Sequence, residues 1–184
     1  MGSFKNSKYL ATGTTQGEVK LWEKSSGLSL ATFNEHSANV TDIKFSNANT
    51  LFSCSLDGTV HAYDALKYKK FRTFRPDTKC QLNCMALDEA GEIVFAGAFD
   101  PYEIYAWNVQ TTNILQIIRG HEGPVSCLEL CGDYLVTGSW DKTLKIHQVY
   151  ARKLNVETLE HSSQITALAF HPDGKQFAAA TIRG

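Results

Sequence analysis

The sequence lacks any large excess of charge of one sign. It has 18 Lys and Arg residues against 19 Asp and Glu residues, a formal net charge of −1 at pH 7. Such a chain has no overall field that would recruit a nucleic acid or a membrane to its whole surface. Long apolar runs are also missing. None approaches the ~18 consecutive residues that a membrane-spanning helix needs, and no signal peptide is visible.

Cysteine is scarce and odd in number. The five cysteines fall within expected strands or at their ends, which is typical of free thiols in a reducing compartment such as the cytosol or the nucleus. No stripe of apolar residues at helical spacing runs through the chain. The pattern therefore favours a β protein without disulfides.

What is present is a repeat of about 40–45 residues. One slot, with an aromatic residue or histidine, recurs at intervals of 41, 44 and 40 residues. It is filled by Trp22, Tyr63, Trp107 and His147. A second slot, mostly Gly-His, is filled by His36, His121 and His161, with Cys80 near the missing histidine. A tight turn precedes the aromatic slot by six residues, as at Asp57-Gly58.

Within one repeat, short β-branched or aromatic runs bounded by Asn, Asp, Gly or Pro predict strands. We expect them at residues 38–45, 51–55, 59–63 and 70–75. The period and the Gly-His and Trp-Asp slots resemble the WD40 repeat, which implies four-stranded propeller blades. We therefore expect an all-β propeller fragment of about four blades of four-stranded antiparallel sheets, incomplete at both ends.

The repeat also predicts the units of the chain. We expect full units at 36–78, 79–120 and 121–160, and partial ones at 8–35 and 161–184. Residues 1–3 have the composition of an expression scar. Open blade edges are templates for association, so we expect the fragment to self-associate, to be disordered at one or both ends, or to be completed by another chain that supplies the rest of the propeller.

Histidine, serine and aspartate recur together in these repeats and could be misread as a catalytic triad. An active site is needed once, whereas these residues come back in separate units of the repeat. The WD40 resemblance implies a structural hydrogen-bond relay, and we expect no enzymatic activity. The expected relay residues are His36, Ser55, Asp57, Tyr63, His121, Ser139, Asp141 and His147.

The pairs Cys80-x3-Cys84 and Cys127-x3-Cys131 have a spacing that a zinc site could use. Asp42 fills the slot of Cys84 and Cys127 in another repeat. This favours a position that needs a small side chain. We expect no metal and no other cofactor.

The residue before each turn aspartate is large and apolar in several repeats. In the WD40 family this slot and two slots of the first strand open on the top face, which would make a partner-binding surface. The expected residues are Leu56, Phe99, Trp140, Asn39, Thr41, Gln81, Asn83 and Ser126. The alternative is that Leu56 and Phe99 only pack over their blades.

A cluster of cations and aromatics fills residues 67–75. It could bind RNA phosphates and stack bases, or it could be the outer strand of a blade, blunted by lysine against aggregation. The cations are Lys67, Lys69, Lys70, Arg72 and Arg75.

Residues 55–64, 68, 71–74 and 120–127 closely resemble the periodic tryptophan protein 2 family, and the resemblance covers about residues 8–184. It implies a non-enzymatic scaffold of the small-subunit processome, which matures pre-18S ribosomal RNA in the nucleolus. Its partners would be protein subunits of a large ribonucleoprotein complex, with an indirect or weak contact to RNA. His147-Gln148 departs from the Trp-Asp or Trp-Ser of the family. The alternative is a propeller of another complex: a coat, a ubiquitin-ligase adaptor or a signalling scaffold.

Overall fold

The computed structural model describes residues 8–46, 49–151 and 156–183. Residues 1–3, expected to come from expression, lie outside this part. The described residues form strands and turns, and none of them belongs to a helix that could cross a membrane. The all-β expectation is confirmed.

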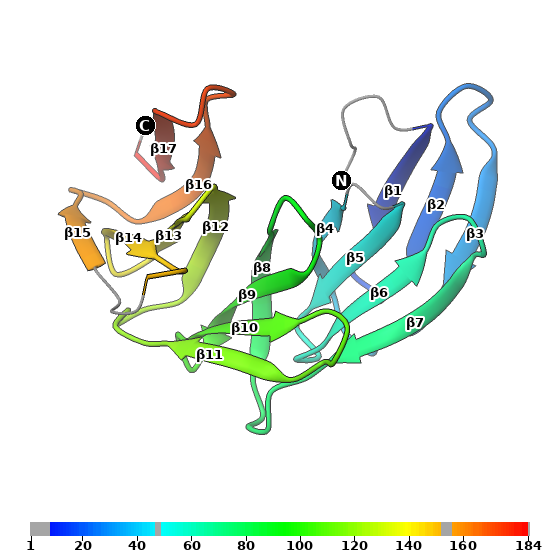
Figure 1. Ribbon diagram of the computed structural model, residues 1–184, viewed down its shortest axis with the longest axis horizontal. Helices are drawn as coiled ribbons and strands as arrows, with labels where there is room; N and C mark the ends of the chain where they lie inside the picture. The colour runs from blue at the N-terminus through cyan, green and yellow to red at the C-terminus, as the bar shows by residue number, and fades with distance from the viewer. Residues whose placement is uncertain (1–7, 47–48, 152–155, 184) are drawn as a thin grey trace.

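The strands pair in chain order into five antiparallel sheets (Figure 1). The first sheet has β1 (Tyr9–Gly13), β2 (Val19–Glu23) and β3 (Ser29–Phe33). The second has β4 (Val40–Phe45), β5 (Thr50–Ser55), β6 (Val60–Asp64) and β7 (Lys69–Phe74). The third has β8 (Gln81–Leu87), β9 (Ile93–Asp100), β10 (Ile104–Asn108) and β11 (Ile114–Ile118). The fourth has β12 (Val125–Cys131), β13 (Tyr134–Ser139), β14 (Thr143–Gln148) and β15 (Val156–Glu160), and the fifth has β16 (Ile165–Phe170) and β17 (Phe177–Thr181).

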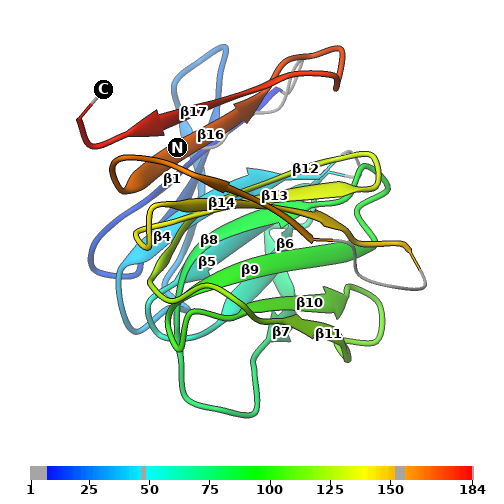
Figure 2. The same cartoon turned by 90° about the vertical axis from the view of Figure 1, so that its left-hand side faces the viewer.

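The sheets stand side by side in an open arc, with the outer strands β3, β7, β11 and β15 on its convex side (Figure 1). In Figure 2 the strands of the fifth, fourth and third sheets follow one another from top to bottom. The first strands β4, β8, β12 and β16 lie on the inside and contact their neighbours in that order. Three complete four-stranded sheets between two smaller ones match the expected fragment of a propeller.

Tight turns join the second and third strands of the sheets. In the second sheet Gly58 has φ 81°, where a residue without a side chain is favoured. A Cβ atom at Gly58 would also lie 2.5 Å from the carbonyl oxygen of Cys80. The corresponding turn of the fourth sheet is made by Lys142 with φ 69°.

The inner strands of the second to fifth sheets, β4, β8, β12 and β16, each carry a β-bulge at the same place. The register shifts at Thr41 in β4, Asn83 in β8, Ser126 in β12 and Thr166 in β16. A bulge re-aims the side chain of the extra residue. Thr41 Oγ1 donates to Leu82 O (3.1 Å), Asn83 Nδ2 to Val125 O (3.1 Å) and Ser126 Oγ to Ile165 O (2.6 Å). These bonds tie each sheet to the next.

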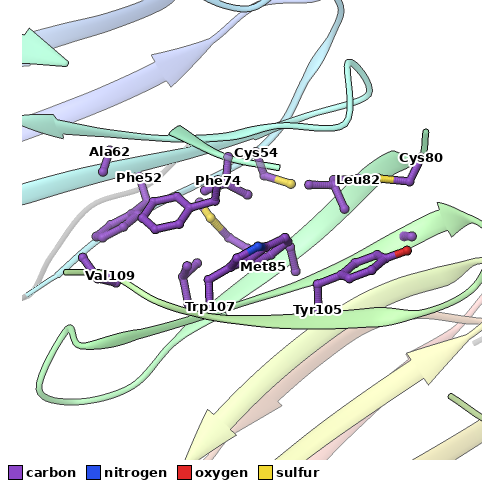
Figure 3. Packing of buried hydrophobic residues seen from close by; sticks show 14 residues of the cluster. Phe52, Cys54, Ala62, Phe74, Cys80, Leu82, Met85, Tyr105, Trp107 and Val109 are labelled. Carbon is purple, nitrogen blue, oxygen red and sulfur yellow. The ribbon is translucent and has the colours of Figure 1, made fainter. Parts of the chain in front are cut away.

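The hydrophobic core lies between the sheets rather than within one layer. A separate apolar cluster fills each of the four interfaces along the arc. The cluster between the second and third sheets contains Phe52 and Phe74 from one side and Met85, Tyr105 and Trp107 from the other (Figure 3). Each sheet thus buries its faces only by stacking on its neighbours, as expected for a repeat protein.

Candidate functional site

An aromatic pair lies where β9 and β13 run into their turns. The rings of Phe99 and Trp140 meet edge to face, with centroids 5.3 Å apart and planes at 84°. Trp140 is 40% exposed, although its backbone is fixed because Trp140 N–H donates to Pro124 O at 3.0 Å. Ile182, in the same slot of the fifth sheet, is 59% exposed. These residues present apolar surface at one end of adjoining sheets.

The polar residues expected beside this pair fall into two groups in the structure, one exposed to solvent and one bonded to the next sheet. Asn39 and Gln81 are exposed, and Asn39 O accepts from the backbone N–H of Leu56, which is half-buried. Thr41, Asn83 and Ser126 instead direct their side chains to the next sheet through the bulges described above. The accessible part of the expected surface is therefore centred on Phe99 and Trp140, to which we refer as the aromatic pair.

A hydrogen-bonded network ties the turn of the second sheet to the loop before β4. His36 Nδ1 lies 2.9 Å from Asp57 Oδ2, and His36 Nε2 lies 2.6 Å from Ser53 Oγ. A carboxylate only accepts, so Nδ1 carries the proton and Nε2 accepts from Ser53 in the neutral ring. Asp57 also accepts from the N–H of Ser37 (3.0 Å) and of Thr59 (2.9 Å).

The fourth sheet repeats the same network. His121 Nδ1 donates to Asp141 (2.8 Å) and His121 Nε2 accepts from Thr137 Oγ1 (2.8 Å). Thr137 Oγ1 then accepts from His147 Nε2 at 3.2 Å. The bonds run in one direction, from the imidazole of His147 to the carboxylate of Asp141.

The expected hydroxyl positions are wrong by two residues. Ser53 and Thr137 bind the histidines, whereas Ser55 Oγ donates to Ala38 O (3.2 Å) and Ser139 Oγ to Gly123 O (3.0 Å). Ser55 and Ser139 also accept from the turn N–H of Asp57 and Asp141, both at 3.1 Å. They hold the turn, and the relay hydroxyl lies one pleat deeper in the strand.

Charges in these networks are set by burial and by hydrogen bonding. Burial would raise the pKa of Asp141, but hydrogen bonds from Thr143, Glu122 N–H and His121 outweigh it and hold that pKa at about 2. Asp57 is likewise held well below its usual pKa despite burial, chiefly by His36 and Thr59. Burial and the nearby charge of His121 lower the pKa of His147 to about 4. At neutral pH Asp57 and Asp141 are therefore ionised, and His147 is neutral.

The order hydroxyl, imidazole, carboxylate is that of a catalytic triad. Ser53 and Thr137 are nevertheless 0% exposed, so a substrate cannot reach either hydroxyl. The network also occurs twice. Geometry and repetition favour a structural role.

His36, Asp57 and His61 bring three possible metal-ligating atoms within 4.8 Å of one another. The Thr59 hydroxyl lies among them, 3.2 Å from His36 Nδ1, 3.5 Å from His61 Nε2 and 2.6 Å from Asp57 Oδ1. It is held among these side chains by the hydrogen bonds just given. Burial also raises the pKa of the Cys80 thiol to about 11.

The third sheet lacks this network. It has no histidine before β8, and Ala96 stands where Thr12, Ser53 and Thr137 place a hydroxyl in their sheets. In the first sheet Trp22 Nε1 donates to Thr12 Oγ1 at 2.9 Å. The corresponding Trp107 Nε1 is buried without a partner among the described residues.

An Ala96→Ser substitution is therefore expected to raise the free energy of unfolding by about 1 kcal/mol, because it gives Trp107 Nε1 an acceptor. Urea denaturation checks the change. The matched control is Ala106→Ser, which puts the same hydroxyl into an apolar cluster and is expected to destabilise. If both variants shift stability equally, the unpaired indole is not the cause.

The five cations expected at residues 67–75 are all exposed on β7 or beside it. Lys70 pairs with Glu35, and Lys67 Nζ lies 3.8 Å from Asp64 Oδ2. The structure thus keeps them together on the outer strand of the second sheet.

The sequence reasoning missed His61, whose ring stacks on His36 at 4.3 Å between centroids. The sequence carried a signal for it, because the position of His61 holds a different residue type in the other sheets. The corresponding residues are Lys20, Tyr105 and Lys145. Burial, then the charges of His36 and Lys70, lower its pKa to about 4.

Comparison with protein families gives a match to the WD40 model, "WD domain, G-beta repeat", over residues 27–64, 112–148 and 153–182. Strands β8–β10, in the sheet without the histidine network, fall outside the matched segments.

Similar curated proteins include "Periodic tryptophan protein 2 homolog" of Dictyostelium discoideum, 39% identical over 95% of this chain and 20% of the relative. "Periodic tryptophan protein 2" of Saccharomyces cerevisiae is 43% identical over 95% of this chain and 19% of the relative. "Guanine nucleotide-binding protein subunit beta" of Oryza sativa subsp. japonica is 28% identical over 77% of this chain and 40% of the relative. The chain spans about a fifth of the length of the first two.

Proposed function

The chain belongs to the WD40 repeat family, and from this membership we propose that it is a non-enzymatic scaffold for ribosome biogenesis. Its place would be the small-subunit processome, where pre-18S ribosomal RNA is matured in the nucleolus of the nucleus. It would act by holding other protein subunits of this large ribonucleoprotein complex. The support for this particular process is the similarity of about 40% to periodic tryptophan protein 2 over nearly the whole chain.

The observation that carries the scaffold role is the aromatic pair. Tryptophan is enriched among residues that dominate binding energy in protein interfaces, and an apolar group on a rigid rim binds without a large ordering cost. The bond from Trp140 N–H to Pro124 O and the edge-to-face contact with Phe99 supply that rigidity. The His–Asp networks, by contrast, have hydroxyls that no substrate can reach.

The second candidate is a signalling scaffold, favoured by the 28% identity to a guanine nucleotide-binding protein β subunit. That identity is lower and covers less of this chain than the similarity to periodic tryptophan protein 2. Ribosome biogenesis is therefore the better supported process.

The experiment is rescue of ribosomal RNA processing in cells depleted of the full-length protein. Re-expression is expected to restore mature 18S RNA relative to the large-subunit RNA, as measured by northern blotting. Depletion that leaves the 18S RNA and its precursors unchanged would reject ribosome biogenesis and leave the signalling scaffold as the better candidate.

A further inference from the structure

Residues 67–75, at the outer edge of the second sheet, concentrate positive charge. The segment holds Lys67, Lys69, Lys70, Arg72 and Arg75, five of the 18 Lys and Arg residues of the chain. It contains no Asp or Glu, although the chain as a whole has a net charge of −1. We call these five residues the basic edge.

The basic edge is not a general property of outer strands in this protein. The outer strands β3 (SLATF) and β11 (ILQII) have no charged residue, and β15 (VETLE) has two glutamates. If lysine served only to blunt exposed edges against aggregation, the apolar β11 would need it most. The charge of β7 is therefore specific to one place in the arc.

Two exposed aromatic side chains lie among the cations. Tyr68 is 43% exposed and Phe71 is 42% exposed. Phe71 falls at the β-bulge where β7 shifts register against β6, and the guanidinium of Arg72 lies 5.8 Å from the centre of its ring. A bulge turns a side chain away from the regular pleat, so an apolar ring stays on the surface of a charged strand.

Some cations of the basic edge make contacts within the protein, and others have no ion-pair partner among the described residues. Lys70 is paired with Glu35, and Arg72 donates to Phe71 O (3.0 Å) and Gln110 O (3.4 Å). Within the described residues, Lys69 and Arg75 have no ion-pair partner. Arg75 also lines a surface cavity of about 340 Å³ beside the turn of Asp57 and Gly58. At least two cations can thus be neutralised by a ligand without breaking an internal contact.

We propose that the basic edge binds single-stranded nucleic acid, with phosphates on the cations and bases stacked on Tyr68 and Phe71. A line of cations that follows the backbone, with aromatic rings that accept any base, is the general chemistry of single-strand binding. A duplex hides its base faces and leaves the two rings without a role. The choice of RNA as the nucleic acid rests on the proposed function. The proposed binding of a single-stranded nucleic acid does not depend on that function.

Binding of a fluorescein-labelled 12-nucleotide oligouridylate to the whole chain, followed by anisotropy, tests the proposal. Each phosphate contact on a single strand adds about −0.7 to the slope of log affinity against log salt. Three contacts give a slope of about −2, or a loss of roughly 20-fold between 50 and 200 mM salt. The variant Lys69→Gln/Arg72→Gln/Arg75→Gln is expected to weaken binding at least about ten-fold at 50 mM salt and to flatten the slope.

Three further variants separate specific binding from a general loss of charge or of internal contacts. Lys24→Gln/Lys175→Gln/Arg183→Gln removes the same charge from other exposed sites and is expected to bind as the unaltered chain does. Lys69→Gln/Arg75→Gln leaves the contacts of Arg72 intact and is expected to reduce the slope by about 1.4. Tyr68→Ala/Phe71→Ala is expected to weaken binding about ten-fold with the slope unchanged.

Equal binding by the triple variant and its control overturns the proposal. The proposal is also overturned if a polyglutamate peptide binds as tightly as the oligouridylate and the Tyr68→Ala/Phe71→Ala variant binds the oligouridylate as the unaltered chain does. That pair of results would make an acidic protein segment the partner. If the oligonucleotide binds but depletion of the full-length protein leaves 18S RNA unchanged, ribosome biogenesis is rejected and this inference is kept. If depletion lowers 18S RNA but the oligonucleotide does not bind, this inference alone is rejected.

Discussion

Trp107→Ala is expected to lower the free energy of unfolding by about 4 kcal/mol, the range for removing a buried tryptophan. Trp107 is 0% exposed and lies in the cluster shared by the second and third sheets (Figure 3). Its ring centroid is 5.6 Å from that of Tyr105 and 6.3 Å from that of Phe74. The substitution leaves a cavity at an interface that joins two sheets, which is why the loss is large.

The matched control is Trp140→Ala, the same change at a residue that is 40% exposed. We expect it to cost less than about 1 kcal/mol. Urea denaturation of the chain and both variants measures the difference. A loss below about 1 kcal/mol for Trp107→Ala would contradict the shared core between the two sheets.

Stability is expected to fall as the pH decreases from about 6.5 to about 4. His61 and His147 are buried, and each has its pKa lowered to about 4 in the folded protein. An unfolded histidine takes up its proton near pH 6.5, so in this window the unfolded chain binds protons that the folded chain does not. Each histidine contributes stability at neutral pH that is lost on acidification.

After allowance for solvent screening, we expect a loss on the order of 2 kcal/mol for each of these two histidines. Below pH 4 the loss continues, because an unfolded aspartate takes up its proton near pH 4 whereas folded Asp141 keeps its pKa at about 2. Urea denaturation at several pH values gives the curve. His61→Gln and His147→Gln are each expected to flatten the curve between pH 6.5 and 4. A slope that stays unchanged in both variants would show that the buried histidines do not control the acid response.

The repeat could be predicted from the sequence because each sheet needs the same turn and the same apolar alternation. The turn at Asp57-Gly58 and the outer strand at Lys69–Phe74 follow from local chemistry, namely positive φ at glycine and alternating side chains. The position of the hydroxyl that contacts His36 could not be predicted in this way. Ser53 and Ser55 lie on the same face of β5, since side chains alternate with a period of two, and only the depth reached by His36 decides between them.

The hydrogen bonds between sheets also could not be predicted from the sequence. Thr41, Asn83 and Ser126 look like alternating strand residues that would face outward, and a bulge has no composition of its own. Their direction is set by which backbone groups of the neighbouring sheet are available, a property of tertiary packing. The unpaired Trp107 Nε1 is similar, because it depends on Ala96 across the strand pair.

We propose that this chain works by presenting a surface rather than by chemistry at its hydroxyl–His–Asp networks. The most direct test is 18S RNA rescue by two full-length variants at matched protein levels. Ser53→Ala/Thr137→Val removes both hydroxyls that contact the histidines, and Phe99→Ser/Trp140→Ser removes the aromatic pair. We expect the first variant to restore 18S RNA and the second variant not to restore it. Rescue by the aromatic variant with failure of the stably folded hydroxyl variant would contradict this proposal.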